Sequence, residues 1–123
     1  MIPVLVAVGG ALGALARYGL SGLVHRFASP YFPWGTATVN LVGCLLFGIV
    51  AGYTDERLTL DPRTRAFILI GLLGGFTTFS TFTFETLELL RDGQVLPAAG
   101  NVAGQLIVGL FALWLGFAGG RLL

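Results

Sequence analysis

Lysine is absent from this chain, and charged residues of every kind make up only 11% of its 123 positions. Soluble domains carry roughly 25% charged and roughly 45–50% apolar residues. Here 55% of the residues are hydrophobic, and the mean hydropathy is +0.87. These values exclude an ordinary soluble domain and predict a protein integral to a membrane. The net charge of +1 offers no extended basic surface, so we expect no nucleic-acid partner.

Residues for covalent or metal chemistry are also scarce. Cys44 is the single cysteine, which excludes an internal disulfide, and its apolar surroundings indicate a small core residue. The single histidine, His25, lies at the end of an apolar run and has no metal-ligating neighbours. No nucleophile–histidine–acid set, phosphate-binding loop or metal-spaced cluster is present, so we expect that the protein is not an enzyme.

Long apolar runs dominate what remains. Each has about the 20 residues needed to cross a hydrocarbon core ~30 Å thick, and none alternates as barrel strands do. The connecting loops are too short to hold a soluble domain. The sequence therefore predicts an all-α membrane protein, with one four-helix transmembrane domain over residues 1–123. The expected spans are about residues 3–23, 34–53, 65–90 and 95–120.

The third span contains an unusual stretch from Gly74 to Thr83. Two adjacent glycines weaken a helix, and five hydroxyl residues and three phenylalanines lie in the same ten residues. Broken helix at membrane depth is tolerated only where it is buried in protein or lines a wet cavity. We therefore expect the third helix to be broken near its middle, either as a packed kink or as part of a permeation pathway.

Small residues recur four apart in every span, which lets helix backbones approach closely. These pairs are Gly9/Gly13, Gly48/Gly52, Gly71/Gly75, Gly100/Gly104 and Gly116/Gly120.

Arginine sets the orientation only weakly. Four helices place both termini on one side, together with Arg57, Arg63, Arg65 and Arg121, whereas Arg26 and Arg91 lie on the other side. This small excess favours cytoplasmic termini but allows both orientations to coexist.

The polar residues within the spans gather in one half of the bundle. Arg17 lies eight residues before His25, and therefore ~12 Å inside that end; Asn40 lies at a similar depth. The full set is Arg17, Asn40, Ser80, Thr81, Glu85, Asn101 and Gln105. A single subunit would hold half a pathway, and an antiparallel partner would complete it.

The chemistry of this set favours a small anion. Arg17 is the deep fixed charge, no acid lies near the middle of any span, and the amides and hydroxyls can donate hydrogen bonds. Phe79 and Phe82 share a face and can present positive ring edges. Each residue also has a plainer interpretation: Arg17 can snorkel, Asn40 can link helices, and the aromatic rings can be core. Likewise Glu85 can reach lipid headgroups, and Asn101 and Gln105 can bond to each other.

Three ordered motifs resemble a known family. Residues 10–18 read GALGALARY, residues 35–43 read GTATVNLVG, and residues 71–82 read GLLGGFTTFSTF. Together with the chain length and four spans, they resemble the Fluc/CrcB fluoride channels. The resemblance implies a passive, fluoride-selective channel that exports fluoride across the cell membrane. It also implies an antiparallel, dual-topology homodimer with two pores and a structural sodium ion at the dimer interface.

The resemblance assigns roles to individual residues. Sodium would be held by the backbone carbonyls of Gly74 and Thr77, and Phe79, Phe82 and Asn40 would line the anion pore. Ser80, Thr81 and Glu85 match polar positions after the helix break, and Arg17 matches the arginine of the first helix. In the fourth span the family usually has Tyr and Ser where this chain has Asn101 and Gln105. This departure leaves open a heterodimer with a related chain.

Two other functions fit parts of the sequence. A small multidrug exporter also has four spans, but it needs an embedded acid in the first span, where this chain has Arg17. A non-conducting structural subunit explains the glycines, but it does not explain why Arg17, Asn40 and the hydroxyl run lie together.

Overall fold

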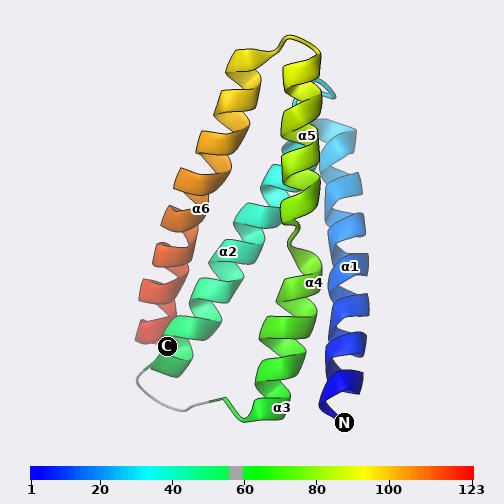
Figure 1. The fold of residues 1–123 in the computed structure, drawn as a ribbon. Helices are drawn as coiled ribbons and strands as arrows, with labels where there is room; N and C mark the ends of the chain where they lie inside the picture. Colours follow the sequence, from blue (N-terminus) through cyan, green and yellow to red (C-terminus); the bar gives the residue numbers. More distant parts are fainter. Residues whose placement is uncertain (56–59) are drawn as a thin grey trace.

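The computed structural model describes residues 1–55 and 60–123, and all regular structure in these ranges is helical. The first two helices are α1 (Ile2–Phe27) and α2 (Trp34–Asp55), and the last is α6 (Val95–Leu122). Between them, four successive pieces form one elongated rod (Figure 1). These are α3 (Pro62–Arg65), the π-helical segment η1 (Ala66–Leu73), α4 (Gly74–Phe76) and α5 (Phe79–Arg91).

Four helical segments are long and apolar enough to cross a membrane: Ile2–Phe27, Trp34–Asp55, Pro62–Arg91 and Val95–Leu122. The predicted all-helical, four-span architecture is therefore confirmed. Each segment is longer than the apolar run that predicted it. Helix α1, for example, continues through His25 and Arg26 in its last turn, where cations are favourable at the C-terminal end of the helix dipole.

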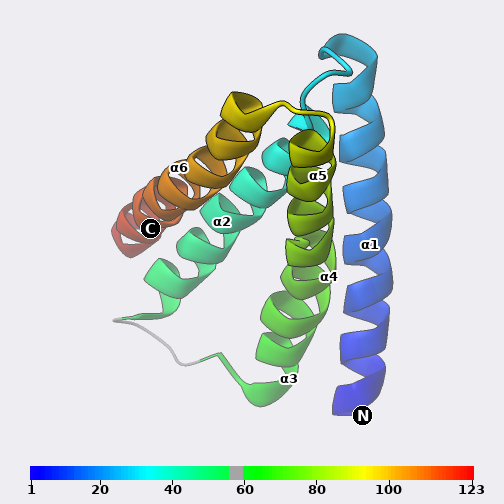
Figure 2. The same cartoon turned by 45° about the horizontal axis from the view of Figure 1, so that its top comes forward.

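Both termini lie at one end of the bundle, and the α5–α6 connection lies at the other (Figure 1). That connection is tight because Gly93 adopts a positive φ of 76°, which only glycine accepts at little cost. Figure 2 shows α1 running beside the third span, and α2 beside α6. Arg57, one of the arginines that set the predicted orientation, lies outside the described residues.

Close backbone contact joins these helix pairs. A Cβ atom on Gly75 would lie 2.7 Å from the carbonyl oxygen of Gly10, so the third span rests directly on the backbone of α1. Gly48, Gly52, Gly116 and Gly120 bring α2 and α6 equally close. Gly100 and Gly104 differ, since a Cβ on either would meet nothing within 4 Å in the described chain.

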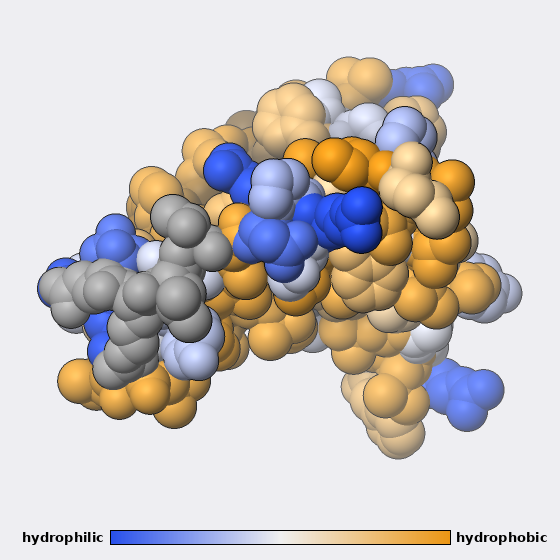
Figure 3. Space-filling view, turned by 90° about the horizontal axis from the view of Figure 1, so that it is seen from below, coloured by the Kyte–Doolittle hydropathy of each residue, from blue (hydrophilic) through white to orange (hydrophobic). Residues whose placement is uncertain are grey.

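The outer surface is mostly apolar. Figure 3, viewed from below, shows a hydrophilic group of residues surrounded by hydrophobic surface. Large side chains on α6 such as Ile107 and Leu110 are exposed, as expected of a helix that faces lipid.

The third span bends at Thr77 and Thr78 rather than at the glycine pair. Gly74 keeps helical angles (φ −64°, ψ −37°), whereas Thr77 (φ −84°, ψ 158°) and Thr78 (φ −149°, ψ 116°) are extended. Helix α5 then begins at Phe79, and the Thr78 hydroxyl caps it by accepting from the N–H of Thr81. Gly75 instead permits the close contact with α1.

Candidate functional site

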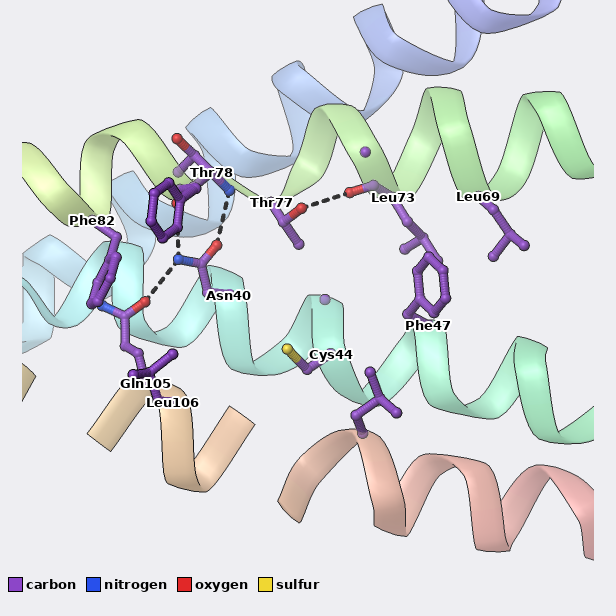
Figure 4. Close-up of a pocket in the computed structure, with 14 residues that line it drawn as sticks. Asn40, Cys44, Phe47, Leu69, Leu73, Thr77, Thr78, Phe82, Gln105 and Leu106 are labelled. Carbon is purple, nitrogen blue, oxygen red and sulfur yellow. Dashed lines mark hydrogen bonds between the residues drawn. The ribbon is translucent and has the colours of Figure 1, made fainter. Parts of the chain in front are cut away.

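A groove of about 390 Å³ lies beside this bend, between α2, the third span and α6. Its walls are largely apolar, and its polar groups come from Asn40 on α2, Thr77 and Thr78 at the bend, and Gln105 on α6 (Figure 4). The other lining residues are Gly43, Cys44, Phe47, Leu69, Leu73, Gly74, Phe79, Phe82, Leu106 and Leu113. This arrangement resembles a small-ligand site, where a few polar groups converge on an apolar surface.

Asn40 pairs with the backbone of Thr78. Its Nδ2 donates to the Thr78 carbonyl oxygen at 3.0 Å, and the Thr78 N–H donates to Oδ1 at 2.9 Å. An extended residue inside a membrane-spanning segment needs such partners, because lipid offers none. Asn40 therefore stabilises the bend itself. The plainer interpretation, in which Asn40 only links two helices, does not include this contact with the Thr78 backbone.

A chain of side-chain hydrogen bonds continues from Asn40. Its Nδ2 also donates to Oε1 of Gln105 at 2.7 Å, and Nε2 of Gln105 donates to Oδ1 of Asn101 at 2.9 Å. Nδ2 of Asn101 then donates to the Thr86 hydroxyl at 2.9 Å, and that hydroxyl donates to the Phe82 carbonyl at 2.8 Å. The two α6 residues that depart from the family pattern thus bond to each other and also tie α2 to α5.

The two expected pore phenylalanines lie together. The ring centroids of Phe79 and Phe82 are 5.8 Å apart at 47°, and both side chains line the groove. Phe82 is 8% exposed, whereas Phe79 is 76% exposed. One ring is therefore part of the groove wall, and the other projects from it.

A second hollow of about 600 Å³ lies on the other side of the bend, between α1, α2 and the start of α5. It is lined by Ala14, Arg17, Tyr18, Ser21, Gly22, His25, Thr36, Val39, Thr78 and Thr81. Thr78 lines both hollows. Arg17 is half-buried here, and no acid pairs with its guanidinium in the described part of the chain. Its charge therefore acts on the hollow without a fixed counter-ion.

Three of the predicted site residues line neither hollow: Ser80, Glu85 and Asn101. The Thr36 hydroxyl donates to Oε1 of Glu85 at 2.5 Å, so this carboxylate bonds across to α2. Ser80 is exposed and lines neither hollow. Thr36 and Thr86 were not predicted as site residues. The spacing of Thr36 places it on the same helix face as Asn40, which is a sequence signal that could have identified it. No local sequence signal identifies Thr86.

The bend also leaves carbonyl groups available. The N–H of Thr78 would close a helical bond to Gly74, but it donates to Asn40. The N–H of Thr81 would form a helical hydrogen bond with the Thr77 carbonyl, but it donates to the Thr78 hydroxyl instead. Two backbone oxygens on adjacent turns are the ligand type that hard cations accept, so these residues fit the expected sodium. Within residues 1–55 and 60–123, no cluster of His, Cys, Asp and Glu could hold a metal ion.

Comparison with known proteins agrees with the motifs. Residues 4–117 match the model of the family described as CrcB-like protein, Camphor Resistance (CrcB). A protein of Nitratidesulfovibrio vulgaris (strain DSM 19637 / Miyazaki F) named "Fluoride-specific ion channel FluC" is 55% identical over 119 residues, covering 97% of this chain and 96% of its own. Proteins of the same name from Solidesulfovibrio magneticus and Maridesulfovibrio salexigens are 50% and 48% identical over 118 residues, covering 96% of this chain and 94% of theirs. This multi-pass membrane protein therefore belongs to the CrcB family.

Proposed function

We propose that this protein is a passive channel that conducts fluoride across the cell membrane. The observation that carries the proposal is the apolar groove in which the amides of Asn40 and Gln105 meet beside Phe82. Fluoride is small and strongly hydrated, so a path must replace its water with close hydrogen-bond donors. The residues alone indicate only a small anion. The choice of fluoride over chloride is supported by the names of the relatives.

The electrostatics support an anion path rather than a cation path. Arg17 lines the hollow on the far side of Thr78, where it attracts negative solutes. The Thr36 hydroxyl donates a hydrogen bond to the Glu85 carboxylate, which reduces the repulsion between this carboxylate and an anion. Because no nucleotide-binding loop is present, flow would follow the fluoride gradient. Export would result when hydrogen fluoride enters from acidic surroundings and dissociates inside.

The assembly we propose is an antiparallel homodimer. Phe79 projects from the subunit at 76% exposure, so its ring would meet a second copy. Gly100 and Gly104 present backbone that nothing in the described chain approaches, as at a helix–helix contact still to be made. In an inverted second copy, the polar half would continue from the polar half of the first subunit across the membrane, so the two halves would form one pathway. The break in the third helix would then lie at the interface, where the carbonyls of Gly74 and Thr77 would hold sodium. A bound sodium ion would link the two bends electrostatically.

Anion efflux from liposomes containing the purified protein tests this function. Fluoride-selective and chloride-selective electrodes would record rapid fluoride loss while chloride is retained. Phe82→Ile should slow fluoride efflux, because it removes the ring that walls the groove. Phe84→Ile is the matched control: Phe84 is exposed on the same helix and lines neither hollow. Equal loss of both anions, or no flux from a folded dimer, would refute the proposal.

A further inference from the structure

We infer that Gln105 supplies the hydrogen bond to the anion in this groove, while Asn40, Asn101 and Thr86 hold its amide in position. The inference rests on the proposed function and names the contact within it. It assigns different roles to the four residues of this hydrogen-bond chain, on the basis of which N–H groups are already used.

Both ends of the hydrogen-bond chain are backbone groups, which determines the direction of every amide. The Thr78 N–H can only donate, so Oδ1 of Asn40 must face it. The Phe82 carbonyl can only accept, so the Thr86 hydroxyl gives it the single proton and accepts from Asn101. Turning over any one amide would oppose two donors at one of its contacts and two acceptors at another. The orientation of the Gln105 amide is therefore determined by its neighbours.

Counting donors then distinguishes the amides. Nδ2 of Asn40 gives one N–H to the Thr78 carbonyl and the other to Gln105, so Asn40 has none left for a ligand. Asn101 is 1% exposed and lines neither hollow, which excludes it from direct contact. Gln105 gives one N–H to Asn101, and its second N–H has no acceptor in residues 1–55 and 60–123.

The surroundings of this second N–H favour an anion. Gln105 lines the groove with Phe82 and Leu106, and the groove surface is mainly apolar. A hydrogen bond to an ion is roughly twice as strong as a neutral one, and low local polarity strengthens it further. No Asp, Glu, Lys, Arg or His is among the described residues that line the groove, so no charged side chain there competes with this N–H for the anion.

Two substitutions at Gln105 separate donation from shape. Gln105→Glu keeps the size and an acceptor for Asn40, but its carboxylate has no N–H. Gln105→Met keeps the approximate size without either function. Both should reduce fluoride efflux by about tenfold or more, as expected when a hydrogen bond to a charged group is lost. Lowering the pH from ~8 to ~5.5 should restore part of the flux in Gln105→Glu alone, because a carboxyl in an apolar groove protonates in this range and regains one O–H donor in place of the two N–H donors of Gln105.

Gln94→Glu and Gln94→Met are the matched controls, since Gln94 is the N-cap residue before α6, lies outside both hollows and makes no cap hydrogen bond through its side chain. Size-exclusion chromatography identifies variants that have lost their assembly. If a Gln105 variant loses its assembly, Asn101→Ser takes its place in the test. It weakens the hydrogen bond that positions the Gln105 amide and should still reduce fluoride flux. Empty liposomes at each pH correct for leakage of hydrogen fluoride.

Each outcome is decisive. Loss of flux in both Gln105 variants, with acid recovery in Gln105→Glu alone, supports the inference. Flux within twofold of the wild type refutes it and leaves the channel function intact. If both variants lose fluoride flux and Gln105→Glu does not recover it in acid, Gln105 has only a structural role, and a hydrogen bond from Gln105 to the anion is refuted. Wild-type protein that passes no fluoride overturns the proposed function, and the inference with it.

Discussion

Asn40 and Thr78 exchange two hydrogen bonds although they are 38 residues apart in the chain. One side-chain amide thereby satisfies both backbone groups of the extended residue in the third span. The contact connects α2 to the bend, and through the bend it positions the start of α5. Substitution of Asn40 should consequently affect folding as well as flux.

Asn40→Leu should destabilise the protein strongly, because it leaves the N–H and the carbonyl of Thr78 without partners. Each unsatisfied buried group costs about 1–3 kcal/mol. Unfolding of the purified protein in detergent, followed by circular dichroism, measures the loss. Thr38→Val is the control, since Thr38 lies on the same helix and its hydroxyl has no hydrogen-bond partner among the described residues. Equal stability of the two variants would contradict the bracing role of Asn40.

Arg17→Gln should slow fluoride efflux most at low ionic strength. The guanidinium lines the hollow beside Thr78, and charge in a confined hollow raises the local anion concentration. Salt screens this attraction over about 10 Å at 0.1 M, so the difference from wild type should shrink as an impermeant salt is added. Efflux measured across a salt series provides the test. Arg26→Gln, exposed and outside both hollows, should show no such dependence.

The four helices were predictable because each apolar run has the length of a membrane span. The shared face of Phe79 and Phe82 followed from their spacing of three residues. These features depend on local sequence, where helix geometry relates position to direction. The family resemblance also rests on contiguous motifs, and the comparisons confirm it.

The position of the bend was not predictable, since it depends on distant contacts. Local propensity indicated Gly74 and Gly75, but both stay helical, and Gly75 packs against the backbone of Gly10. Asn40 instead stabilises extended backbone at Thr78. Thr86 was missed for the same reason: only the fold brings it to Asn101. The roles assigned to the site residues remain predictions.

The hydrogen-bonded Asp61 carboxyl predicts a pH dependence confined to the start of the third span. The Thr64 hydroxyl donates to this carboxylate, and with the N–H groups of Thr64 and Arg63 it lowers the Asp61 pKa below its ordinary 3.8. The cap is therefore fully present above that value and is lost as pH falls through the lower folded pKa. Thr64→Val should raise the Asp61 pKa toward its ordinary value. Carboxyl carbon NMR titration measures it, and an unchanged pKa would refute the role of Thr64.

Neighbouring glycines on α6 should respond in opposite ways to the same substitution. A Cβ on Gly116 would overlap the Leu45 carbonyl of α2, whereas a Cβ on Gly119 would meet nothing within 4 Å in the described chain. Gly116→Ala must push two backbones apart, at a cost of about 1–3 kcal/mol or more. Gly119→Ala should be neutral, or stabilising by up to about 1 kcal/mol, because alanine favours the helix. Thermal unfolding of both variants in one detergent compares them directly. A Gly116→Ala variant as stable as the wild type would contradict packing of α2 on α6 through Gly116, and destabilisation by Gly119→Ala would mean that Gly119 faces a neighbour outside the subunit.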